Sequence, residues 1–234
     1  MDTSLNNDRV NKYRNDIILY IVNNSTSKYP IKVSDIVEKV FDKRRKDFNY
    51  CFSLARTALM EDYGILLKDV PDSKTGKKFI CYSSICAKST SEYDKEQKRQ
   101  ITLLFIVLSY IFMVDNAVYE SQLENFLAGL KIYFDTEHEF FGSNVKKLIT
   151  DTFVRQLYLN KVKSDSELDM EIKYTYDVGF RGYVEFKKED LLRETAKILG
   201  KPPKYFIVQY NKSKEDEEDS DDCSDNDSDS ESDD

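Results

Sequence analysis

Apolar residues recur at helical spacing in three segments of the first half of the chain. They predict helices over about residues 8 to 24 and 47 to 62, and between these a helix with Ser34 as its N-cap. Two strand-like stretches follow, residues 65–70 and 79–83, and the turn-like sequence PDSKTGKK between them indicates a β-hairpin. Three helices followed by a hairpin is the element order of a winged-helix domain.

The second half repeats this order of elements. Helices are predicted over residues 100–114, 119–130 and 143–158, strands over 159–163 and 170–176, and a last helix over 187–199. We therefore predict a mainly α fold with small β-hairpins, an α+β protein built from tandem winged-helix units. The expected boundaries are unit A at 1–86, a linker at 87–99, unit B at 100–210 and a disordered acidic tail at 211–234.

The formal net charge of −8 combines two parts of opposite sign. Residues 215–234 contain 13 Asp or Glu and no Lys or Arg, which leaves 30 acidic against 35 basic side chains in the rest of the chain. With no aliphatic or aromatic residue, this tail cannot offset the entropy of ordering, so we expect it to be disordered. Ser224, Ser228 and Ser230 each precede an acidic residue by three positions, the pattern that acidophilic kinases phosphorylate. The tail would serve as a solubilising spacer, as a shield for the basic body, or as a site for basic partners.

The sequence motifs that many enzyme classes use for catalysis are absent from this sequence. His138 is the single histidine, so an HExxH metal site is excluded and any Ser-His-Asp or Cys-His machinery would need this residue. Because His138 lies among carboxylates in DTEHEFFG, a surface or helix-entry role explains it better than catalysis. The four cysteines form no CxxC pair, which favours an intracellular, reducing compartment. We expect no enzymatic activity, no metal and no cofactor.

The N-terminal sequence lacks the basic-then-apolar plan of a signal peptide. The longest apolar run, residues 101–114, is shorter than the roughly 20 residues that cross a bilayer. It is predicted to be a buried core helix.

Three stretches of the second half resemble the MAGE (melanoma antigen) homology domain. They are LLFIVLSYIF (103–112), FGSNVKKLITDTFVRQLYL (141–159) and YTYDVGFRGYVEF (174–186), followed by KILGKPP. The first half fits more loosely, through KYPIKVSDIV and LMEDYGILLKDV, so that the resemblance covers roughly residues 12 to 210. The chain departs from the family pattern at Val178, Phe180 and Gly182, where the family usually has Trp, Pro and Ala.

The resemblance implies two winged-helix units and a non-enzymatic role beside RING ubiquitin ligases. In the family's ancestral-type member, the domain binds a RING subunit and a kleisin within the DNA-repair SMC (structural maintenance of chromosomes) complex. We expect this role here, in the nucleus and with the cytoplasm as a further location. One alternative is a free-standing regulator of a RING E3 ubiquitin ligase. An alternative from another class is a winged-helix transcription or chromatin factor that mainly binds DNA.

Six consecutive apolar or aromatic residues, 17–22, make the first helix apolar all round. A helix that covers one core needs only an apolar stripe, so this one is either fully buried or partly in contact with a partner. Both explanations stay open from the sequence. The resemblance implies a RING-binding site in this helix, where the family has paired leucines. The nearest positions here are Ile21 and Val22, so the leucines themselves are missing, and the candidates for the site are Ile18, Leu19, Ile21 and Val22.

Two further sites are expected. The resemblance implies an apolar groove for a kleisin helix in the second unit, and the candidates are Phe105, Leu108, Phe112, Leu123, Phe126 and Leu127. Basic residues at the positions where a winged helix meets phosphates are Lys43, Arg44, Arg45, Lys46, Lys146, Lys147, Arg155, Lys161 and Lys163. They predict weak, sequence-independent DNA binding, although an ordinary solvated surface explains them as well.

Overall fold

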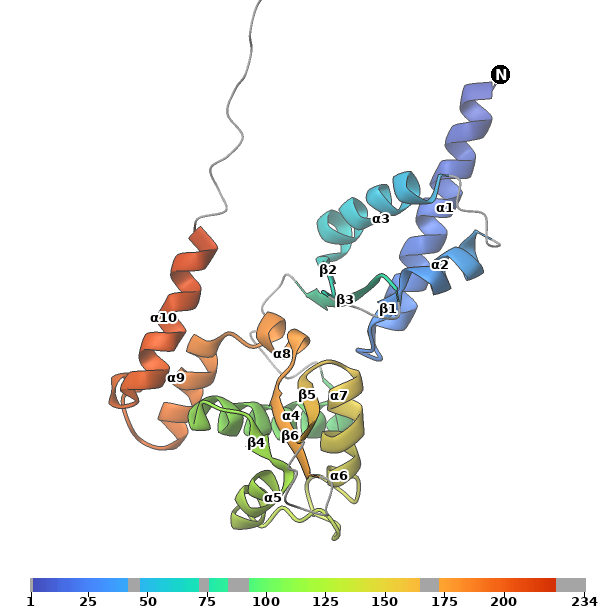
Figure 1. Ribbon diagram of the computed structural model, residues 1–234. Helices are drawn as coiled ribbons and strands as arrows, with labels where there is room; N and C mark the ends of the chain where they lie inside the picture. The colour runs from blue at the N-terminus through green and yellow to red at the C-terminus, as the bar shows by residue number, and fades with distance from the viewer. Residues whose placement is uncertain (1, 42–46, 72–75, 84–92, 165–172, 222–234) are drawn as a thin grey trace, which may run out of the picture. The chain divides into compact units, whose positions relative to one another are not determined.

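The computed structural model describes residues 2–41, 47–71, 76–83, 93–164 and 173–221 (Figure 1). The chain forms two compact units: unit 1 contains Met1–Lys98 and Asp151–Leu157, and unit 2 contains Arg99–Thr150 and Tyr158–Asp234. The described residues are mostly helical, with two small antiparallel sheets. The α+β fold class is thereby confirmed, whereas the domain boundaries drawn from the sequence stay a prediction.

Unit 1 has the element order helix, strand, helix, helix, strand, strand. The elements are α1 (Asp2–Ser25), β1 (Ile31–Lys32), α2 (Val33–Val40), α3 (Phe48–Tyr63), β2 (Ile65–Asp69) and β3 (Lys78–Ser83). The predicted hairpin is the antiparallel pair β2–β3, with Leu67 opposite Cys81. The two-residue strand β1 pairs with the other edge of β3 and gives the sheet order β1-β3-β2.

The start of α2 differs from the predicted one. The helix begins at Val33 with Lys32 as its N-cap, and the Ser34 hydroxyl donates to Asp35 Oδ1 at 3.1 Å instead of capping the helix. Pairing of β1 with β3 accounts for the shift, because Lys32 is held extended opposite Lys78. The Val33 amide also donates to the carbonyl of Lys77 at 3.0 Å. Tertiary pairing thus outweighs the capping preference of serine.

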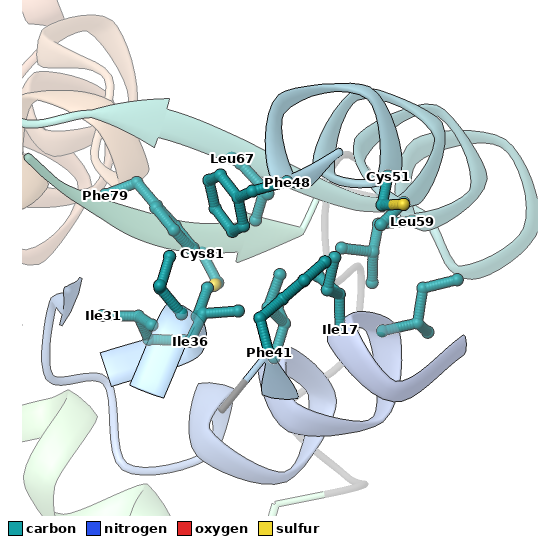
Figure 2. Close-up of a cluster of buried hydrophobic side chains, with 14 residues drawn as sticks. Ile17, Ile31, Ile36, Phe41, Phe48, Cys51, Leu59, Leu67, Phe79 and Cys81 are labelled. Atoms are coloured by element: carbon teal, nitrogen blue, oxygen red, sulfur yellow. The ribbon is translucent and has the colours of Figure 1, made fainter. Parts of the chain in front are cut away.

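The core of unit 1 lies between α1, α2, α3 and the sheet. Figure 2 shows Ile17 of α1, Phe41 after α2, and Phe48 and Leu59 of α3 directed toward one another, and all four are buried. A run of ring contacts from Tyr13 through Phe41, Phe48 and Phe52 to Phe79 crosses this core, with centroid separations from 4.3 to 5.6 Å. The phenylalanines of the first half therefore serve packing.

The remaining elements carry a second small sheet. They are α4 (Lys95–Val114), β4 (Val118–Tyr119), α5 (Glu120–Gly129), α6 (Val145–Lys147), the π-helical turn η2 (Leu148–Thr152), α7 (Phe153–Arg155), β5 (Leu159–Ser164), β6 (Lys173–Val178), α8 (Phe180–Glu185), α9 (Lys188–Ile198), the 3-10 turn η3 (Pro203–Tyr205) and α10 (Ile207–Asp221). The sheet order is β4-β6-β5. The helix predicted over 143–158 is present as α6, η2 and α7 in succession.

Helix α4 supplies much of the unit 2 core. By length and composition alone it could cross a membrane. In the structure, however, it turns a row of side chains into the protein interior, namely Leu103, Leu104, Val107, Leu108, Ile111 and Phe112. This agrees with its prediction as a buried core helix.

Helix α10 continues past residue 210, where the sequence predicts the end of unit B. It starts at Ile207 and continues to Asp221. Contacts with the C-terminal end of α4 hold it: the Gln209 side-chain amide donates to the Met113 carbonyl at 2.9 Å, and Lys212 Nζ lies 2.6 Å from Asp115 Oδ1. The rest of the tail, with Ser224, Ser228 and Ser230, lies outside the described residues.

Candidate protein-interaction surfaces

Helix α1 is buried on one side and exposed on the other. Ile17 and Ile21 are fully buried in the unit 1 core, and Ile18 is nearly so, whereas the side chain of Leu19 is 60% exposed. The helix is therefore not fully buried, and contact of its outer face with a partner stays a prediction. Of the four RING-site candidates, Ile21 belongs to the core, while Leu19 and the half-buried Val22 are accessible.

An open hollow adjoins this exposed side of α1. It is lined by Asn15, Ile18, Leu19 and Val22 of α1 and by Tyr63 at the end of α3. Tyr63 is 55% exposed, and α3 ends there because Gly64 adopts a left-handed conformation with φ of 61°. Apolar walls with one amide and one phenol suit an apolar side chain of a protein partner. Asn15 and Tyr63 were not among the predicted site residues, although LMEDYG marks the end of α3.

Most of the predicted kleisin groove is core. Leu108, Leu123 and Leu127 are fully buried and Phe112 is 8% exposed, because α4 and α5 turn these faces inward. Only Phe105 and Phe126 are half-buried. The Phe126 ring stacks on Tyr110 of α4 with centroids 4.0 Å apart. A partner could reach these three rings without unfolding the unit.

Several of the predicted DNA-contacting side chains already have acidic neighbours. Lys146 Nζ lies 3.8 Å from Asp135, and Arg155 lies 3.6 Å from Asp151. Lys161 is 22% exposed, sits 4.0 Å above the Tyr174 ring and lies 3.9 Å from Glu120. Lys147 and Lys163 are exposed. The other candidates, Lys43, Arg44, Arg45 and Lys46, lie outside the described residues.

Comparison with known proteins identifies the family of this fold. Residues 17–189 match the model of the MAGE homology domain. The chain belongs to the MAGE family. The resemblance seen in the sequence is thereby confirmed.

Relatives of this MAGE chain fall into more than one group. Human melanoma-associated antigen D2 is 29% identical over 202 residues, which cover 86% of this chain and 32% of the relative. The chain thus spans about a third of the length of that relative. The mouse non-structural maintenance of chromosomes element 3 homolog is 30% identical over 206 residues, covering 87% of this chain and 72% of the relative.

A solved structure also matches the fold of this MAGE chain. One chain of an Nse1-Nse3-Nse4 complex superposes with a TM-score of 0.80 and 27% sequence identity. The match covers 88% of this chain and 98% of that chain.

The MAGE motif YTYDVGFRGYVEF has a structural role in this chain. Arg181 of α8 is 1% exposed, and its guanidinium lies 2.7 Å from Glu185 Oε1 one turn later. Tyr158 donates to the other carboxylate oxygen of Glu185 at 2.6 Å, and Arg181 lies over the Tyr158 ring. The charges are therefore paired and hydrogen-bonded inside unit 2, as buried charges require.

The single histidine of this MAGE domain also has a structural contact. His138 Nδ1 accepts the backbone N–H groups of Phe140 at 3.0 Å and Phe141 at 3.2 Å. His138 and Gly142 exchange two backbone hydrogen bonds across the same turn. This arrangement explains the residue as an organiser of its loop.

Proposed function

We propose that the chain is a non-enzymatic MAGE-type scaffold that holds a RING ubiquitin ligase subunit and a kleisin within the nuclear SMC DNA-repair complex. The superposition with a chain of the Nse1-Nse3-Nse4 complex carries this proposal, since it extends over 88% of the chain at a TM-score of 0.80. The 30% identity to a relative named as a chromosome-maintenance element supports it.

The RING subunit binds at the hollow between α1 and the end of α3. Leu19 and Tyr63 are more than half exposed there, although both are large side chains whose exposure to water is unfavourable. A partner side chain placed in the hollow would contact both helices. This is the helix in which the family resemblance implies the RING contact.

The kleisin contacts the half-buried rings of Phe105 on α4 and Phe126 on α5, and the Phe126 ring stacks on Tyr110. The other four residues of the predicted groove act as its support from within the core. DNA contact is secondary, weak and sensitive to salt, since Lys146, Arg155 and Lys161 have acidic neighbours.

Co-expression with RING and kleisin candidate subunits, followed by affinity purification, tests the proposal. Leu19→Asp places a charge in the hollow, and we expect it to reduce retention of the RING subunit at least about tenfold without unfolding the chain. Tyr50→Asp is the matched control, because Tyr50 is 61% exposed near the opposite end of α3, about 20 Å from Tyr63 along the helix axis. Equal retention by wild type and Leu19→Asp would contradict the assignment of this surface.

The same purification separates the alternatives. A RING ligase retained without SMC-type subunits would indicate a free-standing ligase regulator, for which the 29% identity to melanoma-associated antigen D2 is an argument. Retention of specific duplex DNA with neither partner would indicate a winged-helix DNA-binding factor. In unit 1 the third helix, α3, carries one cation, Arg56, which already donates to the Leu67 carbonyl at 2.6 Å. This makes the DNA alternative the weaker one.

A further inference from the structure

Large apolar side chains are concentrated on the surface where α9 ends and α10 begins. Ile198, Leu199, Tyr205, Ile207 and Val208 are each between 54% and 72% exposed. Among the described residues they are five of the sixteen exposed large hydrophobic side chains, although they fall within eleven consecutive positions. We call these five residues the hairpin-end surface, because α9 and α10 pack against each other and η3 connects them (Figure 1).

The exposure of these residues follows from how α10 is anchored. Gln209 and Lys212 face the end of α4, where they contact Met113 and Asp115, and Ser213 is 2% exposed. At 100° per residue, Ile207 then lies on the opposite side of the helix from these anchors, and Val208 lies about a quarter of a turn away from them. The two apolar side chains are held toward solvent on a fixed helix.

Positive charge surrounds the hairpin-end surface. Residues 195–214 contain five lysines and no Asp or Glu, and three of the lysines, Lys197, Lys212 and Lys214, lie within 4 Å of the carboxylates of Glu194, Asp115 and Glu189. Lys197 has an 80% exposed side chain, Lys201 Nζ lies 5.2 Å from the centre of the Tyr205 ring, and Lys204 Nζ lies 5.9 Å from that of Tyr210. The surface therefore combines apolar contact area with a basic rim.

We propose that the hairpin-end surface binds a protein segment in which apolar side chains are flanked by Asp and Glu. Apolar contact supplies binding energy, and acidic flanks complement the lysines, so that both features of the surface are used. The chain's own acidic tail cannot be the occupant, because residues 215–234 contain no aliphatic or aromatic side chain. A bilayer with anionic headgroups is a less suitable ligand for this surface than a protein segment. The 13 acidic residues of the tail begin directly after residue 214, and an anionic bilayer would repel them.

This inference does not depend on the proposed scaffold function. The hairpin-end surface begins nine residues beyond position 189, where the match to the MAGE homology domain ends. It also shares no residue with the hollow at α1 or with the rings of Phe105 and Phe126. A failure of either proposal would leave the other intact.

Selection of a random-sequence peptide library against the full chain tests the proposal. The selected peptides are then measured by fluorescence anisotropy against the variant Ile207→Ser/Val208→Ser. Val162→Ser is the matched control, because Val162 is 50% exposed on β5 of the same unit. We expect a class of peptides that bind wild type and Val162→Ser equally and bind the double variant at least about tenfold more weakly. Both variants replace exposed residues, and unchanged thermal unfolding verifies that they fold.

The amino-acid composition of these peptides, and the effect of charge substitutions on their binding, show which kind of ligand the surface prefers. We expect them to be enriched in Asp and Glu around apolar residues, and to be weakened by Lys201→Glu/Lys204→Glu but not by Lys163→Glu. Peptides that depend on the surface but are neutral or basic would overturn the proposal, as would a selection without surface-dependent peptides. If phosphatidylserine vesicles bind wild type but not Ile207→Ser/Val208→Ser, the ligand of this surface is a lipid membrane and the proposal of a protein segment is wrong.

Discussion

Replacement of Gly182 by alanine should destabilise this chain, although the MAGE family usually has alanine at this position. Gly182 lies inside α8, and a Cβ atom added to it would stand 2.8 Å from the Tyr158 carbonyl oxygen and 2.8 Å from Val178 Cγ1. Both distances are shorter than normal van der Waals contact. The Tyr158 carbonyl cannot easily move away, because it accepts the backbone N–H of Gly179 at 2.8 Å.

Two effects of opposite sign determine the magnitude. Alanine is favoured over glycine inside a helix by about 1 kcal/mol. Forcing one additional carbon atom into a packed site costs typically about 1–3 kcal/mol, and here one of the two close neighbours is a backbone atom. Overpacking should dominate, with a net loss of about 1–2 kcal/mol in the free energy of unfolding.

Urea unfolding followed by far-UV circular dichroism measures this loss. Gly129→Ala is the matched control, because Gly129 ends α5 and a Cβ atom added to it would meet no neighbouring group within 4 Å. We expect the control to be neutral or slightly stabilising. Adding Val178→Ala to Gly182→Ala should recover part of the loss, since only one of the two close contacts disappears. A Gly182→Ala protein as stable as wild type would refute the packing argument.

Two further predictions concern buried polar groups of unit 2. Arg181→Met removes the guanidinium that lies 2.7 Å from the Glu185 carboxylate and should lower the free energy of unfolding by about 3–5 kcal/mol, part of which Arg181→Met/Glu185→Leu should restore in the same urea assay. Burial, and then the hydrogen bond with Glu120, raise the pKa of Tyr176, so the unfolded chain loses this phenolic proton first. The resulting stabilisation is complete below about pH 10 and declines above it. Tyr176→Phe should cost about 1 kcal/mol at neutral pH and show a shallower decline above pH 10, whereas equal slopes would contradict this assignment.

The long elements of this fold could be predicted from the sequence because their apolar periodicity extends over many residues. Helix α3 is an example: Cys51, Ala55 and Leu59 are buried one turn apart. Strands β1 and β4 could not be found in this way, since two residues carry no period and each strand exists through pairing with a distant strand. Likewise, Ser34 has the chemistry of a cap, but the pairing of Lys32 decides where α2 starts.

Which residues of a candidate site are accessible depends on which side of the helix packs against the core. A continuous apolar run does not indicate that side. In α1 the spacing Tyr13, Ile17, Ile21 would have indicated the inner face, with Leu19 opposite it. The hairpin-end surface was missed for a different reason. Gly200 and Pro202 correctly predict the end of α9, but the apolar segment after them does not predict the start of α10.

Buried and exposed residues of the family motifs carry different information about this chain. Arg181, and the inward-facing leucines of LLFIVLSYIF, match the family pattern and are buried, so their match reports the fold. Of the exposed side chains that could select a partner, Leu19 and Ile207 lie outside the stretches that carry the resemblance, whereas Tyr63 lies in LMEDYGILLKDV and the half-buried Phe105 in LLFIVLSYIF. Membership of the MAGE family consequently constrains the architecture strongly and the partner weakly. Substitutions of exposed residues that leave stability unchanged are the ones that can separate a subunit of the SMC complex from a free-standing ligase regulator.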